Sequence, residues 1–489
     1  MRCAAAVNAV PMMDEHDPTS LELSTDQMRS MFDATIARVL DHLAHVGEQP
    51  STGDVTDVLC RSLREPAPEG PTPLEPMLDA FFEEWMPRSL TTNGPGYLAY
   101  VPGGGIFPAA IADLLSNTTN RFTGARFAAP ALVQLEANVL DWLREWMSFP
   151  VTTRGVFTTG GSMATFNAVV CARERLLGAD IRRGVLYTSS QAHHSVKKSA
   201  RLAGILGDRV RALPIDDLYR LRVEALEQAI AHDRAEGLTP FLVVSSAGTT
   251  NTGAVDPLEA IADLCAREGL WHHVDGAYGA FFHACPELRP LLAGLPRADS
   301  LTLDPHKGLF LPYGTGALLV RDGAALRAVH SSTADYLPDR GAEDLYDPSE
   351  FGPDLSRGFP GLRVWLTIKT FGAARIRAAI AEKRALALDA ADRISRIPGV
   401  VMAARPQLSL FAFYLAWPGS TREEENRATR ELLDRIAKRG RVLLTGCSSD
   451  GRCLARVCVL SFRTRQAQID ACVEDVAAEV RAIRARVGR

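Results

Sequence analysis

Lys307 and Asp275 are the two residues whose surroundings in the sequence most favour chemistry. Lys307 lies in SLTLDPHKGLFLPYGTG, a largely apolar segment. An ammonium is disfavoured in apolar surroundings, and the neutral amine is the form that reacts with a carbonyl group to give a Schiff base. Asp275 ends the apolar segment LWHHVD. A carboxylate there needs a cationic partner, such as the protonated nitrogen of a heterocycle. A surface lysine and a loop-capping aspartate are the alternatives.

Two further segments add an anion-binding turn and a pair of histidines. In TTGGSMATFNA, two glycines precede Ser162 at the expected start of a helix. The backbone N–H groups and the dipole at a helix N-terminus attract an anion such as phosphate, although a simple helix cap has the same pattern. His193 and His194 follow an expected strand in SSQAHHSVKKSA. A histidine at that place is either a surface residue or a functional group that titrates near neutral pH.

Alternating strands and helices must position these residues. Apolar runs typical of strands alternate with helical runs from about residue 151 onward. Repeated strand–helix–strand units predict a mostly parallel sheet that is covered by helices on both faces. In such sheets, binding residues lie in loops beyond the carboxyl ends of the strands. The expected strands are GVFTTGG, GVLYTSSQAHHS, VRALPID, FLVVSSAGTT, LWHHVDGAYG, SLTLDPHK and GALLVRD.

The regions on either side predict a helical N-terminus and a small C-terminal domain. Apolar residues recur with helical spacing from about Ser24 to Leu63, and glycines and prolines interrupt the pattern afterwards. The expected order is a loose leader at 1–20, helix at 24–63, a proline-rich linker at 64–76, helix at 77–87, a turn-rich loop at 93–105, a long helix at about 364–392 and α+β structure at 397–489.

Composition narrows the class of protein. The chain has 489 residues, of which 46% are hydrophobic and 23% are charged, and its formal net charge is −4. These values are typical of a globular protein with more than one domain, and they disfavour nucleic acid as a partner. The sequence has no apolar run of membrane-spanning length. Its nine cysteines are spread out without a C-x-x-C motif, which favours reduced thiols, no metal site and a cytoplasmic location.

In this order and at these separations, the motifs resemble those of the pyridoxal-phosphate (PLP) enzymes of fold type I. The resemblance is stronger to the group II amino-acid decarboxylases, the family of aromatic-L-amino-acid decarboxylase, and it extends from about residue 75 to 375. HVDGAYG followed by DPHKG is its most specific part. The motifs that carry it are YLAYVPGGG, TTGGSMAT, QAHHSV, AGTTNTGAVDP, HVDGAYG, DPHKG and RGFPGLRVW.

The resemblance implies an α/β fold like that of aspartate aminotransferase, with a mostly parallel seven-stranded sheet. It implies an N-terminal helical dimerisation segment at 1–100, a large PLP-binding domain at 101–375 and a small C-terminal α+β domain at 376–489. It also implies a homodimer with the active site at the subunit interface. The expected small-molecule partner is an amino-acid substrate, with neither nucleic acid nor a membrane as a partner.

The resemblance assigns roles around the cofactor, PLP. Lys307 would hold the aldehyde of PLP as a Schiff base, Asp275 would pair with the ring nitrogen, and His193 would stack on the ring. A protonated ring nitrogen matters because the ring must accept the electrons released at the substrate Cα. The remaining expected contacts are Ala277 on the opposite ring face, Gly161, Ser162 and His306 at the phosphate, and Thr250 near the cofactor and the substrate carboxylate. Asp304 stands where animal members often have asparagine, and the role of His194 is open.

In this family a tyrosine on a mobile loop supplies the last proton. Tyr336 is the candidate, 29 residues after Lys307 (336 − 307), in a polar, Gly- and Pro-rich segment at 331–358 that is typical of a lid. Tyr346 is the alternative. Relatives with phenylalanine at this position make aldehydes with oxygen, so Tyr336 and His193 favour simple decarboxylation. An oxidative, aldehyde-forming enzyme and a non-catalytic relative are the competing interpretations.

The resemblance leaves the substrate open between two classes. The residues expected around the substrate side chain suit an aromatic ring or a branched aliphatic chain, so an aromatic or bulky apolar L-amino acid is expected. Arg126 could instead pair with an acidic or polar substrate, or it could form an ion pair at the subunit interface. The expected substrate residues are Tyr100, Val101, Pro102, Phe107, Phe122 and, from across the interface, Tyr313.

Overall fold

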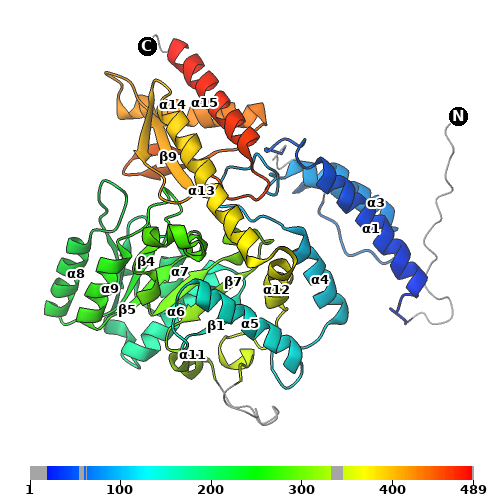
Figure 1. Ribbon diagram of the computed structural model, residues 1–489, viewed down its shortest axis with the longest axis horizontal. Helices are drawn as coiled ribbons and strands as arrows, with labels where there is room; N and C mark the ends of the chain where they lie inside the picture. Colours follow the sequence, from blue (N-terminus) through cyan, green and yellow to red (C-terminus); the bar gives the residue numbers. More distant parts are fainter. Residues whose placement is uncertain (1–18, 54–59, 62, 332–344, 487–489) are drawn as a thin grey trace.

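The computed structural model of the chain describes residues 19–53, 60–61, 63–331 and 345–486. It comprises a helical N-terminal segment, a large domain on a seven-stranded sheet and a C-terminal domain on a four-stranded sheet (Figure 1). In Figure 1 the N-terminal helices, in blue, lie to one side, and the C-terminal domain, in orange and red, lies above the large domain. No helix among the described residues is both long and apolar enough to cross a membrane.

The large sheet has the strand order β1-β7-β6-β5-β4-β2-β3. Only β7 is antiparallel to its neighbours, β1 and β6, whereas the other pairs are parallel. The carboxyl ends of the six remaining strands therefore lie at one edge of the sheet, and the predicted mostly parallel seven-stranded sheet is confirmed. The strands are β1 Arg154–Thr158, β2 Gly184–Ser189, β3 Val210–Leu213, β4 Thr239–Ser246, β5 Trp271–Asp275, β6 Ser300–Leu303 and β7 Gly316–Val320.

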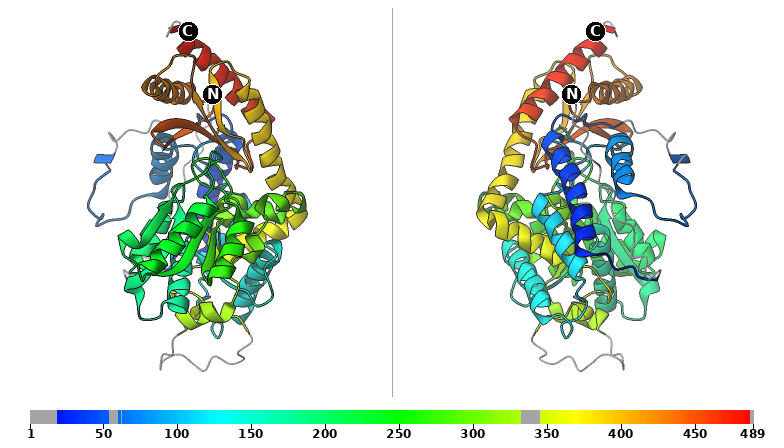
Figure 2. Two further views of the ribbon diagram at one scale, coloured as in Figure 1. Left: turned by 90° about the vertical axis from the view of Figure 1, so that its left-hand side faces the viewer. Right: turned by 90° about the vertical axis from the view of Figure 1, so that its right-hand side faces the viewer.

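Helices cover both faces of this sheet because its strands are apolar on both sides. On β2, Val185 and Tyr187 pack in a cluster with α8 and α9, whereas Leu186 packs in a cluster with α6 and α7 on the other face. Figure 2 shows these layers from the side. The large domain contains α4 Phe107–Thr119, α5 Pro130–Trp146, α6 Gly161–Leu176, α7 Ser195–Leu202, α8 Val223–Ala235, α9 Leu258–Glu268, α10 Pro305–Gly308, α11 Gly323–His330 and α12 Pro360–Phe371.

The N-terminal helix is shorter than its apolar spacing predicts. α1 Thr25–His45 begins with a capping box in which the Ser24 hydroxyl accepts from the backbone of Gln27 and the Gln27 side chain accepts from the backbone of Ser24. The expected helix to residue 63 is wrong, because α1 ends before Pro50, which has no N–H to continue a helix. α3 Leu74–Asp79 follows and continues into a π-helix at Ala80–Trp85.

The long helix expected at 364–392 is two helices. α12 ends at Phe371, and α13 Ala373–Ser395 begins after Gly372. Gly372 has a φ of 77°, a backbone conformation that L side chains avoid and that breaks the helical hydrogen-bond pattern. The break redirects the chain, so that α12 packs on α4 and α5 in the large domain while α13 packs on α15 Gln466–Arg486 in the C-terminal domain.

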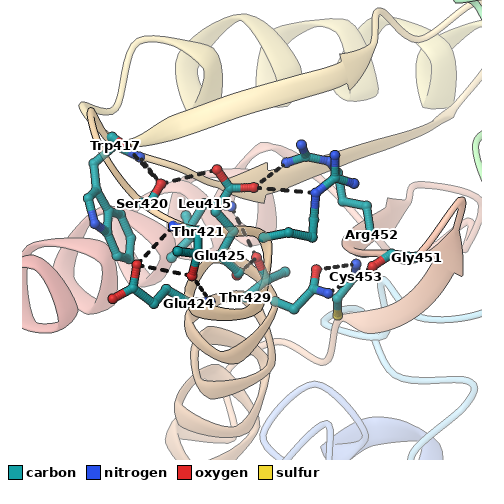
Figure 3. Close-up of polar contacts among 12 residues, drawn as sticks. Leu415, Trp417, Ser420, Thr421, Glu424, Glu425, Thr429, Gly451, Arg452 and Cys453 are labelled. Atoms are coloured by element: carbon teal, nitrogen blue, oxygen red, sulfur yellow. Dashed lines mark hydrogen bonds and ion pairs between the residues drawn. The ribbon is translucent and has the colours of Figure 1, made fainter.

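In the C-terminal domain, α13, α14 and α15 share one hydrophobic core with an antiparallel sheet of order β10-β11-β9-β8. α14 is fixed to the turn between β10 and β11, because Asn426 donates to the carbonyl of Gly451 and accepts from the N–H of Cys453. Figure 3 shows the ion pair of Arg452 with Glu425 beside this turn. The tip of this hairpin is therefore rigidly attached to its own domain. The elements are β8 Val400–Ala404, β9 Leu410–Leu415, α14 Arg422–Arg439, β10 Thr445–Ser449, β11 Arg452–Cys458 and α15.

Candidate active site

A cavity of 250 Å³ lies at the carboxyl edge of the large sheet. Its walls come from the segments that follow β1, β2, β4, β5 and β6, as expected for parallel strands. The cavity brings together all eight residues that the sequence predicts around the cofactor. They are Gly161, Ser162, His193, Thr250, Asp275, Ala277, His306 and Lys307.

Lys307 stands on α10, directly after β6, and its amine faces a carboxylate. Its Nζ lies 2.8 Å from Oδ2 of Asp304, whose side chain is buried. The expectation of purely apolar surroundings for Lys307 is therefore wrong, since the sequence around the lysine is apolar but the group that faces its amine is an anion. The other carboxylate oxygen of Asp304 is buried and has no hydrogen-bond partner among the described residues.

His306 is fixed beside this ion pair. Its Nδ1–H donates to the carbonyl of Thr315 at 2.8 Å, and its Nε2 lies 3.6 Å from Oδ2 of Asp304. Burial lowers the pKa of His306 below its ordinary value, while Asp304 opposes that shift. The ring of Tyr313 lies with its centroid 5.7 Å from that of His306.

Asp275 ends β5 at the floor of the cavity. Its Oδ1 accepts a hydrogen bond of 3.2 Å from the N–H of Ala277, so the side chain is oriented by its own loop. The next residue, Gly276, has no room for a side chain, because a Cβ would lie 2.6 Å from Cβ of Ala280 and 2.9 Å from the carbonyl oxygen of Thr302. This tight turn allows the backbone to pass close to the cavity.

The N-terminus of α6 forms another wall. The N-cap residue is Gly160, which has no side chain to cap the first turn, so backbone N–H groups at the start of α6 face the cavity. A Cβ on Gly161 would lie 3.0 Å from Cβ of Ala277 and 3.0 Å from Oδ2 of Asp304. Glycine at this position therefore keeps the space between the helix and the carboxylate open.

His193 follows β2 and is held by the first residue of α7. Its Nδ1 lies 2.7 Å from Oγ of Ser195 and accepts from the N–H of Ser195 at 3.3 Å. Because a backbone N–H donates to Nδ1, the neutral ring carries its proton on Nε2. Burial, the largest influence, lowers the pKa of His193 below its ordinary value of 6.5. Asp275 and Asp304 raise that pKa, and His194 and Lys307 lower it. The ring centroid of His194 lies 4.1 Å away.

Arg456, on β11, is a residue near the site that sequence reasoning missed. It is buried, and its guanidinium donates to the carbonyl of Thr250, to the carbonyl of Asn251 at 3.1 Å and to that of Tyr100 at 3.3 Å. Its remaining acceptor is the hydroxyl of Thr445 at 3.2 Å. These acceptors, which include no carboxylate among the described residues, join the cofactor loop after β4 to the segment at 93–105.

The residues predicted to contact the substrate do not line this cavity within the described part of a single chain. Tyr100 is 55% exposed and Tyr313 is 53% exposed. Tyr100 has a φ of 49°, which its contacts with Arg456 and Thr445 hold in place. The residues predicted to contact the substrate are Tyr100, Val101, Pro102, Phe107, Phe122 and Tyr313.

The predicted proton donor, Tyr336, lies outside the described residues. Tyr346 stacks on Phe351, with ring centroids 5.3 Å apart, and lines a different cavity beside α5. Part of the described end of the expected lid is packed: Phe351 is buried, and Arg357 forms a buried ion pair with Glu136. Residues 346–352 are buried or half-buried, whereas most of 353–358 is exposed, and the lid at 331–358 stays a prediction.

The cavity fits PLP by the chemistry of its walls. PLP needs an amine for its aldehyde, an anion for its ring nitrogen and N–H groups for its phosphate. Lys307, Asp275 and the start of α6 supply these groups around one cavity. The glycine turn at 160–161 leaves space that a side chain would fill. The residues present therefore fit the cofactor.

Comparison with known proteins assigns the family. The sequence matches the family described as "Pyridoxal-dependent decarboxylase conserved domain" over residues 58–416. It is 33% identical to aromatic-L-amino-acid decarboxylase of Bacillus atrophaeus, over 91% of this chain and 94% of that protein. It is 30% identical to histidine decarboxylase of Homo sapiens, over 87% of this chain and 66% of that protein.

Solved structures and a relative with a different product complete the comparison. The structure of Oryza sativa TDC with PLP and tryptamine has a TM-score of 0.89 and 26% identity, and the match covers 94% of this chain and 100% of that chain. Phenylacetaldehyde synthase of Arabidopsis thaliana is 25% identical over 89% of this chain and 92% of its own length. The chain therefore belongs to the pyridoxal-dependent decarboxylases, with the fold of the type I PLP enzymes, and it is a PLP-dependent lyase of the amino-acid decarboxylase class.

Proposed function

We propose that this enzyme removes CO₂ from an L-amino acid with an aromatic or bulky apolar side chain and releases the amine. The observation that carries the proposal is the single cavity in which Lys307, Asp275 and His193 meet the N-terminus of α6. PLP, when bound, supplies an aldehyde for the substrate amino group and a ring that accepts the electron pair left by CO₂. The steps below concern the residues of this chain.

Lys307 is the amine that would hold the aldehyde of the cofactor. Its position next to Asp304, with Nζ and Oδ2 2.8 Å apart, keeps it at the wall of the cavity. Asp275 holds the proton on the ring nitrogen, because a carboxylate stabilises the charged form of a neighbouring base. The N–H groups at the start of α6, with Ser162 and His306, hold the phosphate.

His193 and Thr250 orient the substrate. His193 would pack its neutral ring on one face of the bound cofactor and Ala277 would contact the other face, since both residues line the cavity. Thr250 lies beside the substrate carboxylate. The bond to CO₂ must stand perpendicular to the ring, and exclusion of water from the carboxylate favours its loss. On the resemblance of the sequence, Tyr336 returns the proton to Cα.

A second copy of the chain completes the substrate pocket. α1 is an amphipathic helix, and the described part of the chain buries none of its residues. Phe32 is 47% exposed and Leu40 is 52% exposed, which supports burial of this face in a homodimer. Tyr100, Phe122 and Tyr313 are exposed too, as residues at an interface site would be. The relative of Bacillus atrophaeus, named for aromatic L-amino acids, supports the aromatic class.

The test is CO₂ release by the holoenzyme from a panel of L-amino acids, with oxygen consumption followed in parallel. Aromatic or bulky apolar substrates should release CO₂ without oxygen uptake. Oxygen uptake with an aldehyde product would identify the chemistry of the phenylacetaldehyde synthase type. Preference for histidine or an acidic amino acid would overturn the substrate class and leave the reaction standing.

The lysine assignment is tested separately. Borohydride reduction followed by peptide mapping should find the cofactor on Lys307. Lys307→Ala should lose this adduct and reduce turnover by about a thousandfold or more. Lys438→Ala, at an exposed position on α14, should retain both. A persistent adduct with unchanged turnover in Lys307→Ala would show that another residue holds the cofactor.

A further inference from the structure

Gln191 occupies the point where three segments around the active site meet. It follows β2, two residues before His193, and its side chain is buried. Its Nε2 donates to Oγ of Ser449, at the end of β10, at 3.0 Å. Its Oε1 accepts from Nδ2 of Asn251, in the loop after β4, at 3.1 Å. One amide therefore connects the large domain to the C-terminal domain and connects two loops of the cofactor cavity to each other.

The hydrogen-bond directions at Gln191 are mutually consistent. Nδ2 of Asn251 is a donor, so it requires the amide oxygen of Gln191, and the amide nitrogen then faces the hydroxyl of Ser449. An additional bond of 3.3 Å from the N–H of Gln191 to Oγ of Ser189 fixes the backbone at the same place. Each polar atom of the Gln191 side chain thus has one partner, which holds the side chain in one orientation.

The partner of Gln191 in the C-terminal domain is itself held firmly. Ser449 is buried and precedes the turn formed by Asp450 and Gly451, which have φ values of 48° and 73°. Asn426 on α14 hydrogen-bonds to Gly451 and Cys453 at this turn. Arg452, between these two residues, forms an ion pair with Glu425 on α14 (Figure 3). The hairpin tip can therefore act as a fixed reference for Gln191.

Asn251, the other partner, transmits this position to Thr250. The carbonyl of Asn251 accepts from Nε of Arg456 at 3.1 Å, and Arg456 also donates to the carbonyl of Thr250. Gln191 therefore holds the side chain of Asn251, and Arg456 holds the backbone of the same loop after β4. Arg456 lies on β11, in the same hairpin as Ser449. Gln191 therefore lies two residues before His193 in the chain, and it is hydrogen-bonded to Asn251, the residue next to Thr250.

We propose that Gln191 is a positioning residue that sets His193 and Thr250 relative to the cofactor, using the β10–β11 hairpin of the C-terminal domain as its reference. The proposal rests on the roles proposed above for His193 and Thr250. It assigns the C-terminal domain a direct part in the geometry of the cofactor site. Gln191 itself touches neither substrate nor cofactor in this account.

The test uses the full-length holoenzyme and signals of the bound cofactor, which do not require that CO₂ be released. Gln191→Leu removes both side-chain bonds at similar volume, and Ser449→Ala removes one. Each should change the visible circular dichroism of bound PLP and weaken its affinity by about three- to tenfold. The double variant should bind PLP as tightly as Gln191→Leu alone, because both substitutions remove the same contact between Gln191 and Ser449. Ser448→Ala, an exposed neighbour on β10, is the matched control and should equal the wild type.

Two outcomes would overturn the proposal. A lower melting temperature with unchanged circular dichroism and PLP affinity would mean that Gln191 only docks the domains. An effect of Gln191→Leu without any effect of Ser449→Ala would mean that the hairpin is not the reference. If Gln191→Leu does not fold, Ser449→Ala and Asn251→Ala, which remove the two bonds one at a time, decide the question by the same signals. Failure of the wild-type holoenzyme to release CO₂, together with the expected changes of the cofactor signal in these variants, would count against the proposed function and not against this role.

Discussion

The buried carboxylate of Asp304 lies 2.8 Å from the amine of Lys307. The residue that would hold the cofactor therefore forms an ion pair with a residue of the same chain. The contact is local, since Asp304 is the N-cap of α10 and Lys307 lies three residues later in the same turn. The amine must leave this ion pair before it can attack the aldehyde. Asp304 therefore opposes the capture of the aldehyde while it holds the amine in place.

Replacing Asp304 by asparagine should consequently speed the capture of PLP. Asp304→Asn keeps the size of the side chain and removes its charge, so the amine of Lys307 no longer has to leave an ion pair before it reacts with the aldehyde. The rate at which cofactor-free protein gains the absorbance of bound PLP should rise about three- to tenfold. Stopped-flow absorbance measures this rate. Asp217→Asn, at an exposed position, should leave it unchanged. A slower rate in Asp304→Asn would mean that the carboxylate serves to position the amine.

Ser195 should influence the pH at which kcat/KM falls on the acid side, because it contacts His193. Oγ of Ser195 lies 2.7 Å from Nδ1 of His193, and a hydrogen bond donated to Nδ1 stabilises the neutral ring and lowers its pKa. Ser195→Ala removes this donor, so the pKa of His193 should rise and the acid limb of kcat/KM should move to higher pH, by about half to one unit. Ser190→Ala, exposed after β2, should keep the original limb. A limb that moves to lower pH would contradict the assignment of the donor.

The strands and helices of the large domain are predictable because each carries its own pattern. β4 and β5 are apolar runs that end in polar residues, and α6 follows a pair of glycines. The same patterns point to Lys307, Asp275, His193 and the turn at 161–162, because the carboxyl ends of parallel strands meet at one edge. Thr250, Ala277 and His306 are expected only from the family resemblance. β10 was missed because its sequence, TGCSS, lacks apolar alternation and only its last residue is buried.

Contacts between distant segments carry no such local signal. Gln191 and Ser449 are 258 positions apart, and Arg456 and Tyr100 are 356 positions apart. A buried glutamine or arginine of this kind looks like a surface residue in the sequence. The break at Gly372 is different: the glycine is visible, but the long apolar periodicity on both sides of it favours one continuous helix.

The exposed apolar face of α1 predicts a dimer that a single charge should weaken. Met28 and Phe32 are 46% and 47% exposed and lie one turn apart. Phe32→Glu places a carboxylate in this stripe, and its burial in an interface is costly. Sedimentation equilibrium should show a dimer for the wild type and at least a tenfold larger dissociation constant, on the order of 1.4 kcal/mol, for Phe32→Glu. Ser30→Glu adds the same charge outside the stripe and should remain dimeric. A wild-type monomer would contradict the dimer.

His272 should make the stability of the fold depend on pH. It lies in β5, with its Nε2 2.8 Å from Oγ of Ser245, and burial lowers the pKa of His272 from 6.5 to about 3. The folded state therefore keeps the ring neutral, while the unfolded state takes up a proton below pH 6.5. This contribution is fully present above pH 6.5 and is lost as the pH falls toward 3. The wild type should lose free energy of unfolding between pH 7 and pH 5.

Replacing His272 isolates its share of that loss. His272→Phe cannot take up a proton in either state, so the difference in free energy of unfolding between pH 7 and pH 5 should shrink by about 2 kcal/mol, which is 1.5 pH units at about 1.4 kcal/mol each. Urea denaturation at the two pH values measures it. The lost contact with Ser245 lowers stability equally at both pH values and cancels in the difference. His232→Phe, at an exposed position on α8, should retain the wild-type dependence, and an unchanged difference in His272→Phe would mean that the ring is protonated in the folded state.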